Sequence, residues 1–176
     1  MGGDYGINRL IEQLQLEIGA NVYQRFDKCE GTHIERIFET GLHAMSAFLG
    51  LQGVPGSIAP ATFLPGSMPD DVGFGPGRSH IYFWRQYTVL DWKVDFLLGM
   101  QALDGGECYV VVECDGHEFH ERTKEQAAKD RSRDRRLQDA GYRIHRYTGH
   151  ELYKDPWQCV NDAMLSLLRL AEGQAR

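Results

Sequence analysis

The sequence predicts a single α/β domain in which a central mixed β-sheet is flanked by α-helices. The chain has 176 residues, 42% of them hydrophobic, which suits one buried core and leaves no room for a second domain. Apolar residues recur at helical spacing near both ends, and strongly apolar segments typical of strands lie between them. We expect residues 1–28 to form an N-terminal helical extension and residues 50–80 to form a Gly/Pro-rich loop or insertion.

Two amphipathic helices are predicted at the start of the chain. Residues 7–18 carry apolar side chains at helical spacing, and Gly19 follows as a stop signal. Thr32 precedes Glu35 by three residues, which is the spacing of a capping box, and apolar residues then recur with helical period. Glu35 is therefore either a capping residue or an acid with a further role.

Two strands follow the loop. Residues 89–98 alternate in polarity, and this places Asp95 on the more polar face of a strand. Residues 108–115 are apolar almost throughout, as expected of a central strand, and the period of two puts Glu113 and Asp115 on one face. Gly116 ends this strand.

The last third of the chain predicts a helix, a strand and a helix. A capping box at Thr123 opens a helix that Gly141 closes, residues 142–148 form a strand, and residues 157–170 form an amphipathic helix. The inward stripe of the first helix contains Asp130 and Asp134, which need cationic partners. We favour a structural ion-pair network over a second metal site, with these arginines as the partners: Arg133, Arg143 and Arg146.

The charge distribution indicates where a polyanion would bind. The net charge is −6 and the isoelectric point is about 5.6, but basic residues outnumber acidic ones between residues 121 and 146. We predict that Arg131, Arg135 and Arg136 bind nucleic acid through its phosphates, although a basic helix face is more often only solvated.

Cysteine spacing and hydropathy restrict the setting of the protein. The four cysteines show no CxxC spacing and no disulfide-framework density, so a reduced, cytoplasmic protein is expected. No apolar run is long enough to span a bilayer, and the sequence does not indicate an oligomeric state.

Three acids suit a hard cation. Asp95 lies near a strand end, and the next strand presents Glu113 and Asp115 on one face, so carboxylate oxygens converge on rigid elements. Bringing them together without a cation is costly, because crowded carboxylates raise one another's pKa. A bound Mg²⁺, for which Mn²⁺ substitutes, would remove this conflict and activate a water molecule.

These segments resemble the PD-(D/E)XK nuclease superfamily, in particular the branch similar to the very-short-patch repair endonucleases. The resemblance rests on WRQYTVLDWKVD (84–95), VVECDGHEFH (111–120), KDRSRDRRLQDAGYRIHRYTG (129–149) and CEGTHIE (29–35). It implies a restriction-endonuclease-like fold and an endonuclease that hydrolyses DNA with Mg²⁺, in DNA repair, restriction or mobile-element biology. It also assigns the metal to Asp95 and Glu113, with Glu35 as the helix acid.

The chain departs from the superfamily pattern at Asp115, where a lysine is usual, and a carboxylate cannot replace a lysine as donor. Lys93, Lys124 and Lys129 are possible replacements. The resemblance has a histidine at His120, and because imidazole titrates near neutrality we expect this residue to take part in proton transfer. Arg85, Gln86 and Lys93 are otherwise interpreted as solvated strand residues, apart from the resemblance at Gln86.

Three alternatives remain open. The cysteines Cys108 and Cys114 with His117 and His120 form a weak zinc-ligand set, whose spacing matches no common finger. A nuclease-like fold that binds nucleic acid or a protein partner without cutting is the runner-up function. An RNA-processing enzyme on the same fold is the third, since nothing in the sequence distinguishes RNA from DNA.

Overall fold

The computed structural model describes residues 3–51, 56–62, 64–66, 79–102, 106–116 and 123–173. The elements in chain order are α1 (Gly3–Lys28), α2 (His33–Leu51), β1 (Gly56–Pro60), β2 (Ser79–Val89), β3 (Trp92–Gln101), β4 (Glu107–Asp115), α3 (Lys124–Asp139), β5 (Arg143–Thr148), α4 (Gly149–Lys154) and α5 (Pro156–Ala171).

The described strands form one mixed sheet, as the sequence predicts. The strand order is β1-β2-β3-β4-β5. The outer pairs β1–β2 and β4–β5 are parallel, whereas β2–β3 and β3–β4 are antiparallel. The last pair in the β3–β4 ladder at its Asp95 end is Phe96 with Val112, so the two strands stop pairing next to Asp95 and Glu113.

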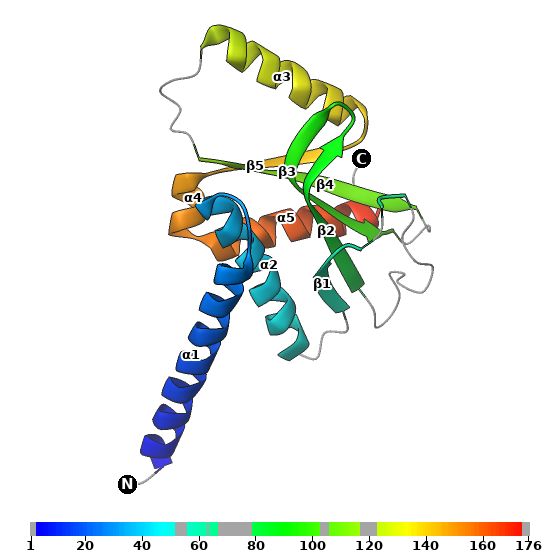
Figure 1. Ribbon diagram of the computed structural model, residues 1–176. Coiled ribbons are helices and arrows are strands. Elements are labelled where there is room, and N and C mark those ends of the chain that lie inside the picture. Colours follow the sequence, from blue (N-terminus) through cyan, green and yellow to red (C-terminus); the bar gives the residue numbers. More distant parts are fainter. Residues whose placement is uncertain are drawn as a thin grey trace.

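Helices cover both faces of the sheet, which gives an α/β sandwich (Figure 1). On one face, Phe38 of α2 and Val160 of α5 pack against Val110 and Val112 of β4. On the other face, Leu137 of α3 joins a smaller cluster that contains Val111 and Val94. The alternation along β4 is the period of two expected of a central strand buried on both faces. Helix α1 extends away from the sheet (Figure 1).

The first helix is longer than its sequence predicts. We expected Gly19 to end it, but α1 continues through Gly19 to Lys28. A glycine in a helix interior lowers helix stability by roughly 1 kcal/mol and ends the helix only when it adopts a left-handed conformation. Gly19 is not among the glycines with positive φ, whereas Gly31, just before α2, has a φ of +94°.

Three elements were not predicted from the sequence: β1, β2 and α4. Strand β1 lies inside the segment interpreted as a loop and pairs in parallel with β2. The predicted strand 89–98 in fact spans a hairpin, because β2 ends at Val89 and β3 begins at Trp92. Two-residue hairpin turns are usually recognised by Asn, Asp or Gly at positions with positive φ. Here the position with positive φ, +53°, is occupied by Leu90, so the pair Leu90-Asp91 does not indicate a turn. The short helix α4 lacks a clear apolar stripe.

Among the described residues, no helix combines the length and the apolar character needed to cross a membrane.

Candidate functional site

The Asp95 carboxylate lies where β3 and β4 diverge. Its Oδ2 accepts a hydrogen bond of 2.7 Å from the backbone N–H of Cys114. This bond replaces the strand pairing that ends at Phe96 and fixes the side chain between the two strands. The strands that carry Asp95 and Glu113 therefore stop pairing beside these two residues.

Gln86 joins Asp95 to Glu35. Its Nε2 donates to Glu35 Oε2 at 3.0 Å and to Asp95 Oδ1 at 3.3 Å. Because one amide nitrogen carries two protons, it can satisfy both carboxylates at once. The interpretation of Gln86 as a solvated strand residue was wrong. The residue has a φ of +47°, and a backbone conformation of this kind cannot be read from the sequence.

Glu35 both caps α2 and faces the site. Its Oε1 accepts a 2.8 Å bond from the Thr32 hydroxyl, and the Thr32 oxygen accepts a 3.4 Å bond from the Glu35 N–H. The other oxygen, Oε2, faces Gln86. The side chain is buried, and a Cβ added at Gly31 would lie 2.4 Å from Oε2. The two interpretations of Glu35 are therefore compatible, because each oxygen serves one of them.

A partly buried ion pair joins α2 to β2 beside this cluster. The Nε of Arg85 lies 2.9 Å from Oε2 of Glu39, and Glu39 follows Glu35 by one helical turn. Neither atom has a hydrogen bond of good geometry within the described part of the chain, so the attraction is mainly electrostatic. Arg85 was interpreted as solvated, and this is corrected: its side chain is mostly buried and pairs with Glu39.

The surroundings of Asp95 favour its protonated form. Burial raises the pKa of Asp95, and the nearby Glu35 raises it further. The hydrogen bonds from Cys114 and Gln86 and the charge of Arg133 act in the opposite direction without overcoming burial. A partly buried carboxylate with a raised pKa is characteristic of functional sites, because a cation that binds there recovers the cost of its burial.

Glu113 faces the opposite side of the sheet from α2 and is paired with Arg133 of α3. The side chains of Glu113 and Arg133 are only 14% and 18% exposed. The Nε of Arg133 is buried and has no hydrogen-bond partner among the described residues. Burial and the nearby Arg146 lower the pKa of Arg133. Arg133 thus balances the charge of Glu113.

The acids do not form a metal-binding group as they stand. Within the described ranges, no set of three or more His, Cys, Asp or Glu side chains is arranged to hold a metal ion. Asp115 ends β4 on the same strand face as Glu113. Cys108 and Cys114 are free thiols, and Cys114 packs in the core on the far side of β4. His117 and His120 lie outside the described residues.

The basic helix α3 is held by ion pairs. Arg146 bonds Asp134 at 2.9 Å, so the structural interpretation of this acid is confirmed. Arg136 lies 3.3 Å from Asp91 and stacks over the Trp92 ring, with its guanidinium carbon 4.5 Å from the ring centroid. All three arginines predicted to bind nucleic acid are exposed on α3: Arg131, Arg135 and Arg136.

Comparison with known proteins agrees with this fold. The model of the REase_MTES_1575 family, a restriction endonuclease-like domain, matches residues 78–167, just over half of the chain. This segment contains Gln86, Asp95, Glu113 and Arg133, whereas Glu35 lies outside it. No curated protein and no solved structure gives a significant match. The chain therefore belongs to the REase_MTES_1575 family of restriction endonuclease-like domains, and this family indicates a nuclease whose substrate is DNA.

Proposed function

We propose that this protein is a Mg²⁺-dependent endonuclease that hydrolyses DNA phosphodiester bonds at Asp95 and Glu113. The observation that carries the proposal is the arrangement around Asp95. This half-buried carboxylate is held between Glu35 and the end of β4 by Gln86 and by the Cys114 N–H. A protein that needed only stability would place an apolar residue there, since burying adjacent acids is costly.

The donor types at the site suit Mg²⁺, with Mn²⁺ as a substitute. Asp95 and Glu113 offer the carboxylate oxygens that hard cations prefer, and restriction endonuclease-like domains are typically metal-dependent. A bound ion would supply an activated water and neutralise charge on the phosphate. For Glu113 to act as a ligand, its carboxylate oxygen must bind the metal ion either in place of the Arg133 guanidinium or together with it. Binding of the ion is therefore coupled to movement of that arginine.

Arg133 is our candidate for the cation that the superfamily pattern places at the position of Asp115. It contacts Glu113, and its charge also acts on Asp95, so it lies near both proposed ligands. Its buried Nε–H, which has no hydrogen-bond partner in the described part of the chain, is a donor suited to a phosphate oxygen. Of the lysines considered from the sequence, Lys93 and Lys129 are exposed. We propose that Asp115 supports the site and that His120 takes part in proton transfer.

The biological setting follows from the resemblance to the very-short-patch repair endonucleases. This branch tolerates replacement of the lysine, which supports the assignment, and it suggests a role in DNA repair, restriction or mobile-element biology. We propose that Arg131 and Arg135, exposed on α3, bind the DNA backbone.

A cleavage assay on mixed substrates tests the proposal. Supercoiled, linear and single-stranded DNA and RNA should be incubated with the protein in Mg²⁺, in Mn²⁺ and in EDTA. We expect cutting of DNA with either metal, none in EDTA and none by Asp95→Asn. The matched control is Asp139→Asn, which changes an exposed acid on α3. A folded wild-type protein that cuts no substrate with either metal, or an Asp95→Asn variant that retains full activity, would contradict the proposal.

One observation favours the alternative, a non-catalytic binding module. The Glu113–Arg133 pair gives Glu113 a structural partner that needs no metal. On this alternative, no metal stabilises the fold, and the wild type binds DNA without cutting it. The cleavage assay and the melting temperature in Mn²⁺ together separate the two functions.

A further inference from the structure

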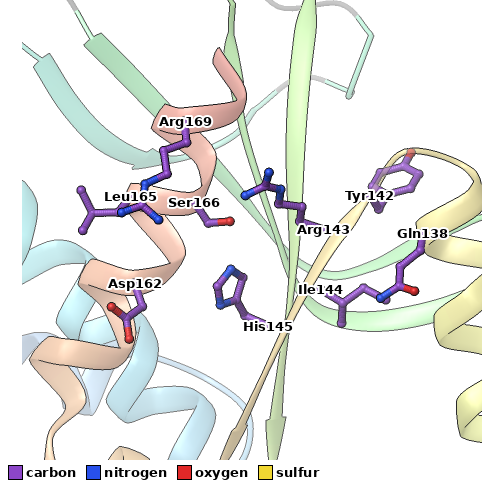
Figure 2. A pocket seen from close by; sticks show the side chains of 9 residues that line it. All are labelled: Gln138, Tyr142, Arg143, Ile144, His145, Asp162, Leu165, Ser166 and Arg169. Carbon is purple, nitrogen blue, oxygen red and sulfur yellow. The ribbon is translucent and has the colours of Figure 1, made fainter. Parts of the chain in front are cut away.

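A cavity of about 460 Å³ lies between the outer strand β5 and helix α5 (Figure 2). Its volume is within the range of about 300–1,000 Å³ that is typical of small-molecule sites. Arg143 and His145 project into it from β5, and Ser166 and Arg169 line it from α5. Tyr142 lies on the other side of β5, so the cavity wraps around the edge of this strand (Figure 2).

The polar groups of the cavity are predominantly donors. Among the described residues, neither Arg143 nor Arg169 forms an ion pair or a hydrogen bond with another side chain. Figure 2 shows the Arg143 guanidinium directed toward the Ser166 hydroxyl, with the His145 ring beside them. Asp162 is the acid in the lining, and its Oδ1 accepts a bond of 2.7 Å from Gln158. Two cations against one acid leave an excess of positive charge.

The cavity is separate from the Asp95–Glu113 site. Arg146 is in register with Glu113, and Arg143 with Val110. Arg143 therefore lies three residues along β5 from the position opposite Glu113, a distance of roughly 10 Å. Arg143 and His145 lie on the same strand face as Tyr147, which packs in the core with α2 and α5. Glu113 faces α3 on the other side of the sheet. An anion in the cavity would therefore not contact the proposed ligands.

We propose that this cavity binds a phosphate group carried by a nucleotide or by the end of an oligonucleotide. Arg143, Arg169 and Ser166 would hold the phosphate, because planar guanidinium groups and a hydroxyl match its oxygens. The cavity is larger than phosphate alone requires. Tyr142 and Gln138 at its other end offer a ring for stacking and an amide for a base.

A purely structural role explains only part of this arrangement. Arg169 lies in the last turn of α5, where the helix dipole favours a cation. Charged residues on β5 also discourage pairing of this edge strand with another chain. Neither effect requires Arg143 to point toward Ser166 across a cavity.

Calorimetric titration in EDTA tests the proposal. The probes are inorganic phosphate, deoxyadenosine 5′-monophosphate, deoxyadenosine, and a trinucleotide with and without a 5′-phosphate. We expect phosphate-bearing probes to bind and both unphosphorylated probes not to bind. Arg143→Gln should weaken binding about tenfold or more, since it removes a charge-assisted contact. The control Arg9→Gln, an exposed arginine of α1, should bind as the wild type does.

The outcomes separate this site from the proposed catalytic one. If the nucleotide binds more tightly than phosphate, the ligand is a nucleotide. If the phosphorylated trinucleotide binds more tightly than the nucleotide, the ligand is the end of an oligonucleotide. If all three phosphate-bearing probes bind equally, the cavity recognises the phosphate alone. All three support the anion site. The proposal is overturned if no phosphate probe binds at millimolar concentration. It is also overturned if Glu113→Gln abolishes binding while a folded Arg143→Gln variant does not. Neither result bears on whether the protein cuts DNA.

Discussion

Replacing either partner of the Glu113–Arg133 pair should lower the free energy of unfolding of the metal-free protein. Replacing both should lower it by much less than the sum of the two single effects. The pair is mostly buried, with side chains 14% and 18% exposed. Arg133→Gln leaves Glu113 as an unpaired anion whose strand neighbour Asp95 already has a raised pKa. Glu113→Gln leaves a buried guanidinium without its anion.

The magnitude follows from the burial of the pair. Breaking a fully buried ion pair costs roughly 3–5 kcal/mol, and partial exposure here reduces this to about 2–4 kcal/mol for either single variant. For a domain of this size, each kcal/mol lowers the melting temperature by about 2–4 °C. We expect a coupling free energy of about 1–3 kcal/mol in the double-mutant cycle.

Urea unfolding of the wild type, both single variants and the double variant in EDTA measures the coupling. Addition of Mn²⁺ should restore part of the stability lost in Arg133→Gln, because the metal replaces the missing cation beside Glu113, and it should restore none in Glu113→Gln. A coupling free energy below about 0.5 kcal/mol would refute the reasoning, since the two side chains would then not interact in solution.

Three further changes test the surroundings of the site. Gly31→Ala should reduce cleavage and lower stability by about 1–2 kcal/mol, because φ is +94° and the new Cβ would lie 2.4 Å from the Glu35 carboxylate; cleavage equal to that of the wild type would show that Glu35 is dispensable. Asp95→Asn should stabilise the metal-free protein at neutral pH. Burial raises the folded-state pKa of Asp95, so its contribution to stability is present below the ordinary value of about 3.9 and is lost as pH rises through the folded pKa. The stability difference between variant and wild type should therefore grow with pH in melts from pH 4 to 8, and a constant difference would contradict the stated cause. Arg131→Gln with Arg135→Gln should weaken DNA binding and flatten its salt dependence in anisotropy titrations, because fewer counterions are released, and an unchanged salt slope would place the binding face elsewhere.

Strands β4 and β5 and part of β3 were predictable from the sequence because their signals are local, whereas β1 and β2 were not predicted. The run from Val110 to Val112 is apolar, and the alternation around it assigns Glu113 to one face of the strand. The same period placed Asp95 in a neighbouring strand, although that strand spans Trp92–Gln101 and not residues 89–98. The capping box at Thr32 predicted the start of α2 because that motif is complete within four residues.

The partners of the acids were not predictable in the same way. Gln86 reaches Glu35 and Asp95 from a left-handed backbone position within a strand, and no residue pattern announces this conformation. Helix α3 is polar almost throughout, so its sequence does not show which side faces the sheet. Arg133 is one of several arginines on this helix, and the sequence therefore did not identify it as the partner of Glu113. Both contacts join residues far apart in the chain, where spacing carries no information.

The most direct test of the central claim is the effect of Glu113→Gln on cleavage and on DNA binding, measured separately. Single-turnover cleavage in Mg²⁺ should be slower by about a hundredfold or more, because activation of water by a metal lowers the barrier by several kcal/mol. DNA affinity in EDTA should be unchanged or higher, since the variant releases Arg133 from its anion. Both assays belong at a temperature where the variant is folded, with Asp139→Asn as the control. A folded Glu113→Gln variant that cleaves at the wild-type rate would contradict the account.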